Sequence, residues 1–189
     1  METNLTKYLK TQCHTYKPRI PTSLRIICWA EEVPMPNGGI VDVIRFEDEY
    51  ASVEHTCGWN KDCPYTARRE NGCHGCIYVR RRFGPVRPLC TCYEVKISMR
   101  DFHSGHGTNF FGQENYFVVP KEIEQTICAS TEHFFPHVGV LSLHGRYLRL
   151  ARPCIRQEVA EGTMLQLMYT AFKSSMKSIP GNQPVHSRR

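Results

Sequence analysis

The sequence predicts one α/β domain, of the α+β kind, whose strands form a single mixed sheet. Short segments rich in β-branched and aromatic residues alternate with segments of helical periodicity, which is typical of sheets covered by helices. With 189 residues, of which 41% are hydrophobic, the chain is long enough to bury a core within one domain. We expect this domain to span residues 1–178, with an insertion at 57–92 and a disordered tail at 179–189.

The N-terminal part predicts a helix followed by a hairpin. Residues 3–16 show helical spacing, and Pro18 ends the pattern. The apolar residues at this spacing are Leu5, Tyr8, Leu9 and Cys13. Residues 25–33 and 40–46 have strand composition, and the stretch PMPNGG between them is typical of a turn.

The C-terminal part predicts the remaining sheet and two further helices. We expect strands at 90–98, 115–119, 138–143 and 146–150. Pro120 suits the first turn of a helix that continues to about residue 129. A last helix is expected at about 157–176, because Leu165, Met168, Phe172 and Met176 recur on one side.

The chain offers no segment suited to a membrane. It has no run of about 18 apolar residues, which a spanning helix needs. Its start also lacks the apolar stretch of about 7–15 residues found in signal peptides. We therefore expect a cytoplasmic protein without a membrane partner.

Positive charge is concentrated in the insertion. Residues 57–92 contain seven basic and two acidic residues, a net +5 out of the whole chain's +6. Such a patch is typical of phosphate contact, although a solvated loop without a partner is the alternative. The arginines expected to contact a nucleic-acid backbone are Arg68, Arg69, Arg80, Arg81 and Arg82.

Six of the ten cysteines lie in the same insertion, which indicates metal binding in a reducing cytosol. A structural zinc site of four thiolates is expected. Its ligands are Cys57, Cys63, Cys73 and Cys76. Cys90 or Cys92 could replace one ligand. We expect both instead to lie near the active site or in its wall, because they alternate with Glu94, a candidate catalytic residue, along one strand. The other four, Cys13, Cys28, Cys128 and Cys154, are expected in the core.

The residues that indicate catalysis lie on two predicted strands. Asp42 stands within IVDVI, and Glu94 and Lys96 stand in CYEVKI. Residues two apart on a strand share a face, so Glu94 and Lys96 project together. An acid on an adjacent strand could share a divalent cation with Glu94, and Lys96 could position or deprotonate a water. Alternatively, the two acids lie on a wet sheet face and pair with a basic residue.

These motifs resemble the PD-(D/E)xK nuclease superfamily, and within it the MmcB-like repair nucleases and small phage or prophage proteins. The resemblance rests on IVDVI, CYEVKIS, RDF and NYFVVP, and covers roughly residues 24–153. It implies a restriction-endonuclease-like αβββαβ core that hydrolyses DNA with Mg²⁺ or Mn²⁺. Asp42 and Glu94 would hold the metal, the Val95 carbonyl would assist, and Lys96 would be the catalytic lysine. Glu32, or Glu31, would match an upstream acid.

The segment after Lys96 departs from the family pattern. Its many glycines disfavour the usual second helix. Asp101 could cap a short helix or take part in catalysis. His103 and His106 could contact phosphate or act in proton transfer, although exposed loop histidines are more common.

The function predicted from the sequence is a metal-dependent DNA nuclease for DNA repair or for phage and prophage DNA processing. A non-catalytic zinc protein that binds nucleic acid is the main alternative. A protein-interaction module built on the zinc knuckle is a second one. The sequence leaves the oligomeric state open, with a homodimer as one option.

Overall fold

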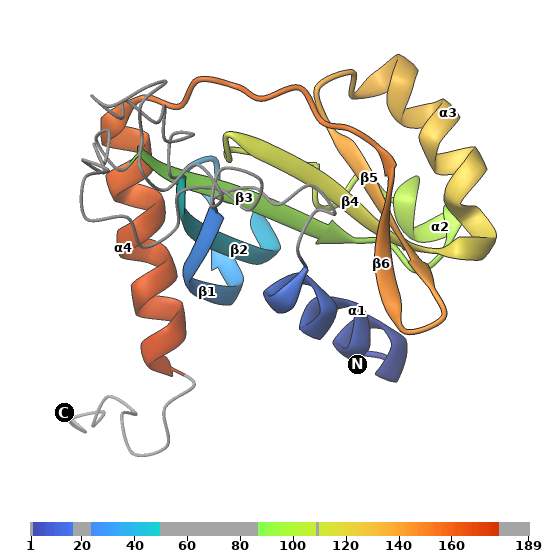
Figure 1. Cartoon of the computed structure of the whole chain (residues 1–189), viewed down its shortest axis with the longest axis horizontal. Helices are drawn as coiled ribbons and strands as arrows, with labels where there is room; N and C mark the ends of the chain where they lie inside the picture. The colour runs from blue at the N-terminus through green and yellow to red at the C-terminus, as the bar shows by residue number, and fades with distance from the viewer. Residues whose placement is uncertain (1, 17–23, 50–86, 109, 178–189) are drawn as a thin grey trace, which may run out of the picture.

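The computed structural model describes residues 2–16, 24–49, 87–108 and 110–177 (Figure 1). The predicted tail at 179–189 lies outside these residues, as does most of the predicted insertion. So do the predicted zinc ligands and phosphate-binding arginines, namely Cys57, Cys63, Cys73, Cys76, Arg68, Arg69, Arg80, Arg81 and Arg82. The last residues assigned to the insertion, 87–92, belong to a strand of the sheet.

The described residues form an α+β structure around one mixed sheet of six strands. The strands are β1 (Leu24–Pro34), β2 (Ile40–Glu49), β3 (Arg87–Val95), β4 (Glu114–Pro120), β5 (Gly139–His144) and β6 (Tyr147–Arg152). They lie in the sheet in chain order. β1, β2 and β3 are antiparallel neighbours, β3–β4 and β4–β5 are parallel, and β5–β6 closes the sheet as an antiparallel pair. The predicted mixed sheet is confirmed.

Four α-helices and one 3-10 turn accompany the sheet in the described part of the chain. They are α1 (Asn4–Thr15), α2 (Met99–Phe102), η3 (Lys121–Ile123), α3 (Glu124–Phe134) and α4 (Glu161–Lys177). α4 packs on β1, α1 contacts β2 and β3, and α3 contacts β5 and β6 (Figure 1). No described helix is both long and apolar enough to cross a lipid bilayer.

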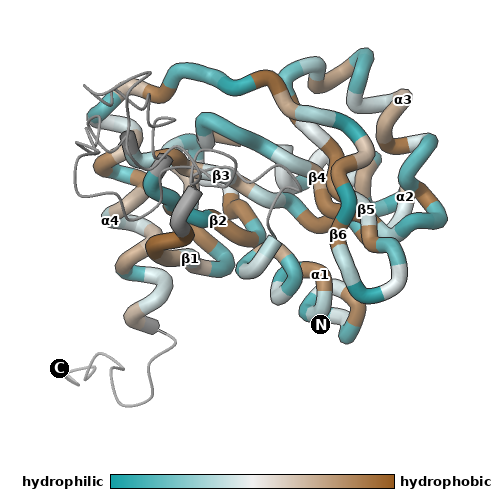
Figure 2. The backbone as a smooth tube through the Cα atoms, viewed as in Figure 1, coloured by the Kyte–Doolittle hydropathy of each residue, from teal (hydrophilic) through white to brown (hydrophobic). Residues whose placement is uncertain are grey.

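The helices cover the sheet through separate apolar clusters. One cluster joins β1, β2 and β3 to α4, and contains Ile44, Phe46 and Leu167. A second joins the sheet to α1 through Leu9, Cys13, Val43, Tyr93 and Val95. A third lies under α2 and α3, around Phe102, Phe117 and Ile127. Figure 2 shows the resulting alternation of hydrophilic and hydrophobic bands along α3 and α4.

Two helices bury faces that differ from the apolar spacing of the sequence. α4 packs with Met164, Leu167 and Ala171, while its predicted apolar residues are 67% (Leu165), 44% (Met168) and 62% (Phe172) exposed. α1 buries Leu9 and Cys13 as expected, together with a lysine, Lys10. Leu5 and Tyr8 are each 38% exposed. Packing against the sheet decides both faces, because hydrophobic spacing defines only a broad stripe on a helix.

The cysteine predictions can be compared with the described part of the structure. Cys13 is buried, and Cys128 and Cys154 are partly buried. Cys28 is exposed, so its assignment to the core was wrong. Cys90 and Cys92 are fully buried in the cluster beneath α4, which makes them core residues.

Candidate functional site

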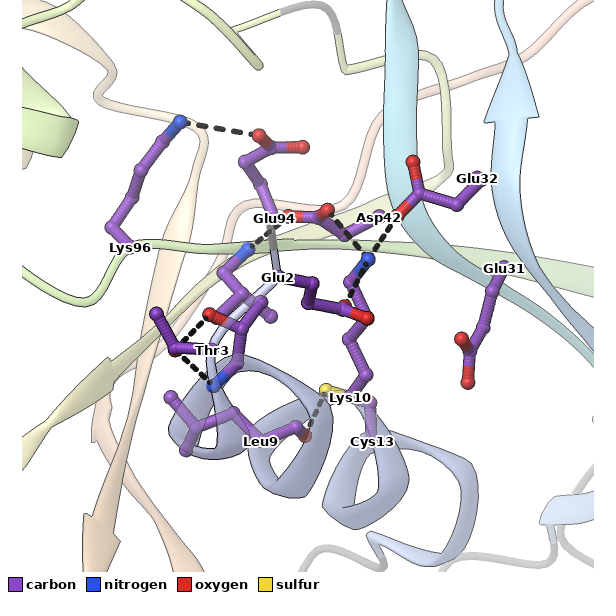
Figure 3. A network of polar contacts seen from close by, with 12 residues as sticks. Glu2, Thr3, Leu9, Lys10, Cys13, Glu31, Glu32, Asp42, Glu94 and Lys96 are labelled. Atoms are coloured by element: carbon purple, nitrogen blue, oxygen red, sulfur yellow. Dashed lines mark hydrogen bonds and ion pairs between the residues drawn. The ribbon is translucent and has the colours of Figure 1, made fainter.

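Three acidic residues stand in a row across β1, β2 and β3. Glu31 pairs with Val43 and Val33 with Val41, so Glu32 lies across from Asp42. Val43 pairs with Tyr93, and continuing that register by one residue brings Asp42 across from Glu94. Side chains directly opposite on antiparallel strands have Cβ atoms about 4.5–5.5 Å apart. We call Glu32, Asp42 and Glu94 the acidic row; Figure 3 shows the three side chains next to one another.

The middle carboxylate of the row is held by the backbone of β3. The β2–β3 ladder ends at the pair Val43–Tyr93. Beyond it the Val95 N–H donates to Asp42 Oδ2 at 2.8 Å, so the side chain takes the place of a ladder acceptor. The Val95 side chain is buried in the cluster under α1. The orientation of Asp42 is therefore set by the end of the strand pairing.

Glu94 and Lys96 form a buried, hydrogen-bonded pair at the end of β3. Lys96 Nζ lies 3.2 Å from Glu94 Oε1, and the two side chains are only 3% and 8% exposed. The Lys96 N–H donates to the Val118 carbonyl at 3.0 Å, which keeps Lys96 aligned with β4 although β3 ends at Val95. The ammonium also donates to the His106 carbonyl at 2.6 Å. The predicted shared direction of these two side chains is confirmed.

The glycine-rich loop after α2 closes over Glu94. Gly107 has φ +72°, and a Cβ built on it would lie 1.5 Å from Glu94 Oε1. The loop backbone can approach the carboxylate only because residue 107 has no side chain. The glycines that disfavour a longer helix therefore allow this loop to cover the site and to place the His106 carbonyl against Lys96.

Gly107→Ala is expected to displace Glu94 and weaken any function of the acidic row. Gly105→Ala is the matched control, because Gly105 has φ +74° but nothing within 4 Å of the added Cβ. Both variants carry the cost of a left-handed alanine, about 1–2 kcal/mol, and only Gly107→Ala also overlaps Glu94. We expect divalent-metal affinity, measured by calorimetry, to fall at least tenfold more in Gly107→Ala. Equal losses in the two variants would show that the loop does not shape the site.

Lys10 is the residue of the site that the sequence did not indicate. It comes from α1, and its side chain is 3% exposed. Its ammonium lies 3.2 Å from Asp42 Oδ1 and 3.0 Å from Glu2 Oε1, and it donates to Glu32 (Figure 3). No local motif marks such a lysine, since its partners come from two strands and from the chain ahead of the helix.

A buried arginine on β2 anchors the helix that carries Lys10. The Arg45 guanidinium donates to the Cys13 and Tyr16 carbonyls at the end of α1, each at 2.8 Å. A cation at this end of a helix satisfies free carbonyls and interacts favourably with the helix dipole. Glu47 balances the charge of Arg45 at 2.7 Å. The position of Lys10 over the acidic row is thus fixed by contacts at the far end of α1.

Charge in the row is balanced by burial and by the two lysines. The pKa of Glu94 is raised to about 8, mainly by burial and also by the nearby Asp42, while Lys96 lowers it. Burial also raises the pKa of Asp42, against the Val95 N–H and Lys10, which lower it. For Lys10, burial lowers the pKa, but the three carboxylates raise it above 10.5 overall. The row therefore favours protons or cations over three free negative charges.

The structure distinguishes the two candidate upstream acids. Glu32 faces Lys10, whereas Glu31 lies 2.9 Å from His14 Nε2, one helical turn further along α1. Glu32 also has φ +51°, the left-handed region that non-glycine residues rarely adopt. Such strain in a strand often accompanies a functional position, because the surrounding structure must hold it.

The strain at Glu32 predicts an unusual order of stabilities. Glu32→Gly and Glu32→Ala both remove the carboxylate, so they lose the same contact with Lys10. Glycine adopts φ +51° without steric cost, so we expect Glu32→Gly to be more stable than Glu32→Ala by about 1 kcal/mol. Urea unfolding of the two variants measures this difference. A more stable alanine variant would mean that residue 32 relaxes to ordinary strand geometry.

Other residues singled out from the sequence have structural roles. Ser98, not Asp101, is the N-cap of α2, and the Asp101 carboxylate accepts the Ile97 N–H at 3.1 Å. Asp101 still lies 3.9 Å from Lys96 Nζ. His103 and His106 have exposed side chains. His106 contributes its backbone carbonyl to the site, where it accepts from Lys96.

The donors in the row suit a hard cation that keeps part of its water shell. Within the described ranges, no three His, Cys, Asp or Glu side chains are arranged to hold a metal ion on their own. Asp42 and Glu94 offer two carboxylates on adjacent strands, and their mutual repulsion contributes to the raised pKa of Glu94. Mg²⁺ is commonly bound by one or two carboxylates plus waters and substrate phosphates. The residues present therefore fit Mg²⁺ or Mn²⁺.

Comparison with known proteins adds little to this geometry. No protein-family model matches the chain, and no curated protein matches it. Among solved structures, it is similar to the SPO1766 protein of unknown function from Silicibacter pomeroyi, with 14% identity and a TM-score of 0.46. The alignment covers 79% of this chain and 74% of that one. Similarity at this level carries no inference about function.

Proposed function

We propose that the chain is a metal-dependent DNA nuclease of the PD-(D/E)xK type. The observation that carries the proposal is the cross-strand pair Asp42 and Glu94 together with Lys96, which is buried against Glu94 at 3.2 Å. A buried ion pair is often less favourable than an apolar pair of the same size. Its place at the end of a core strand, beside a second carboxylate, is better explained by chemistry than by stability.

The order of the elements also supports this type of nuclease. α1 precedes three antiparallel strands, and the short α2 leads into β4, which is parallel to β3. This is the αβββαβ order that the resemblance implies. α2 has only four residues, so this chain would use a glycine-rich loop where relatives use a longer helix.

The side chains suggest a division of labour. Asp42 and Glu94 would hold Mg²⁺ or Mn²⁺, with the Val95 carbonyl as a further ligand. When bound, such an ion lowers the pKa of a coordinated water and stabilises the charge that develops on a phosphate. Lys96 would orient the attacking water and accept or relay its proton. The loop around Gly107 would exclude bulk water from Glu94.

The proposal includes residues beyond those that the structure describes. Cys57, Cys63, Cys73 and Cys76 would bind a structural Zn²⁺, because thiolates suit zinc while carboxylates suit Mg²⁺ or Mn²⁺. The nearby arginines would contact the DNA backbone without reading its sequence. We place the reaction in a reducing cytosol, in DNA repair or in phage and prophage DNA processing.

Cleavage of DNA by the full-length chain tests the proposal. Linear, nicked and branched DNA are incubated with Mn²⁺ or with a chelator, using the wild type, Asp42→Asn and Asp48→Asn. Asp48 lies on the same strand, outside the acidic row, and is the matched control. We expect Mn²⁺-dependent cleavage by the wild type and by Asp48→Asn, and none by Asp42→Asn.

Three other outcomes would contradict the proposal. DNA binding without cleavage of any substrate would favour the non-catalytic nucleic-acid-binding protein. Equal cleavage by Asp42→Asn and the wild type would place any activity elsewhere in the preparation. A chain with neither binding nor cleavage would favour the protein-interaction module.

A further inference from the structure

The Lys10 ammonium lies at one end of the acidic row, in contact with Glu32 and Asp42. The acidic row offers two gaps, one between Asp42 and Glu94 and the other between Glu32 and Asp42. The Lys10 ammonium lies in the second gap, 3.2 Å from Asp42 Oδ1, and donates to Glu32 (Figure 3). Lys96 instead contacts Glu94, at the opposite end of the row from Glu32. The two gaps are therefore not equivalent.

Lys10 is poorly placed to leave its gap. Its side chain is 3% exposed and contacts the carboxylates of Glu2, Glu32 and Asp42. The helix behind it is fixed by buried Leu9 and Cys13 and, at its C-terminal end, by Arg45. An incoming ion would have to expel a buried ammonium from three carboxylates, each of which would lose a charge-assisted contact.

Among the described residues, no lysine lies within ion-pair distance of both Asp42 and Glu94. The ammonium of Lys96 approaches Glu94 from the side of the His106 carbonyl. Asp42 Oδ2 accepts one backbone N–H, and a carboxylate oxygen has a further lone pair for another partner. A divalent ion could enter here without moving either lysine, because each ammonium contacts only one of these two carboxylates.

We propose that Lys10 takes the place of a second metal ion and makes the acidic row a one-ion site. The inference rests on the proposed function, because it takes the Asp42–Glu94 gap as a metal site. Lys10 supplies positive charge that neither exchanges with solvent nor activates a water. Glu32 then serves to hold Lys10 and is not a metal ligand.

The number of Mn²⁺ ions bound to the zinc-loaded, full-length chain tests this role. Titrations followed by electron paramagnetic resonance are made on the wild type, Lys10→Met, Lys7→Met and Lys10→Met with Glu32→Gln. Lys7 is an exposed lysine on the same helix and serves as the control. We expect one ion in the wild type and in Lys7→Met, and two in Lys10→Met. The double variant should return to one, because it loses a carboxylate of the new site.

A labelling experiment on the wild type covers the case in which Lys10→Met does not fold. Acetic anhydride should modify Lys7 but leave Lys10 unmodified, both without Mn²⁺ and at saturation. Labelling of Lys10 that appears as Mn²⁺ binds would show that the ion displaces it. That result would overturn the inference. So would a wild type that binds any number of Mn²⁺ ions other than one, or a folded Lys10→Met variant that binds only one.

The outcomes for Lys10 and for the nuclease are separable. If the wild type binds one Mn²⁺ ion and Lys10→Met binds two, but the wild type does not cleave DNA, the role of Lys10 stands and the nuclease function is rejected. DNA cleavage by a wild type that binds two ions in the row would reject the role of Lys10 alone.

Discussion

Lys96→Met is expected to lower the single-turnover rate of DNA cleavage by about 100- to 10,000-fold, the usual contribution of a positioned acid or base. Methionine keeps most of the side-chain volume but cannot orient or deprotonate a water. Lys121→Met, in the exposed 3-10 turn before α3, is the control and should cleave at the wild-type rate. Rates are measured at saturating DNA and Mn²⁺, so that weaker binding does not enter the comparison.

The fold should survive this substitution. Removing one partner of a buried ion pair usually leaves an uncompensated charge, which is strongly destabilising. Glu94 avoids that cost by keeping a proton, because its pKa is already raised to about 8, mainly by burial, and the substitution removes a group that lowers it. Circular dichroism and thermal unfolding would verify the fold. A folded Lys96→Met variant that cleaves within threefold of the wild type would exclude Lys96 from the chemistry.

Binding of a divalent ion is expected to release a proton from Glu94. The folded, metal-free chain keeps this carboxyl neutral up to about pH 8, whereas the ordinary pKa is 4.5. A bound ion requires the carboxylate, so Mn²⁺ affinity should rise by up to about tenfold per pH unit between pH 5 and 8 and level off above. Calorimetry at pH 7 in two buffers of different ionisation enthalpy should show close to one proton released per ion.

The same group sets a pH dependence of folding stability. Because the pKa of Glu94 is raised by folding, its neutral form contributes stability that is fully present below about pH 4.5 and is lost as the pH rises to about 8. Glu94→Gln should remove this dependence and the proton release together. An Mn²⁺ affinity that is flat from pH 5 to 8 in the wild type would show that Glu94 is not a ligand.

Much of the sheet could be predicted because strand signals are local. Stretches such as IVDVI and CYEVKI combine β-branched or aromatic residues with single charges, and the period of two places Glu94 and Lys96 on one side. The alignment of Lys96 survives beyond the end of β3 because its N–H continues the pairing with β4. The prediction that Asp42 lies near Glu94 depended on the assumption that their two strands are neighbours. The register of β2 and β3 supports that assumption.

Lys10 and Gly107 could not be predicted, because tertiary contacts give them their roles. In the sequence, Lys10 is a polar residue next to the apolar stripe of a helix. Its burial depends on where α1 meets the sheet, which Arg45 on β2 determines. In the sequence, Gly107 indicates only that a helix is disfavoured. In the structure, its lack of a side chain leaves space for Glu94. Neither the contact of Lys10 with the acidic row nor that of Gly107 with Glu94 can be inferred from the local sequence.

The position of the metal is the most direct test of the central claim that the acidic row is a catalytic metal site. Crystals grown with millimolar Mn²⁺ and measured at the manganese absorption edge would locate the ion by its anomalous signal. We predict one peak in contact with the carboxylates of Asp42 and Glu94, and none in the gap between Glu32 and Asp42 that Lys10 occupies. A peak elsewhere, or none at the row in crystals that still cleave DNA, would contradict the claim.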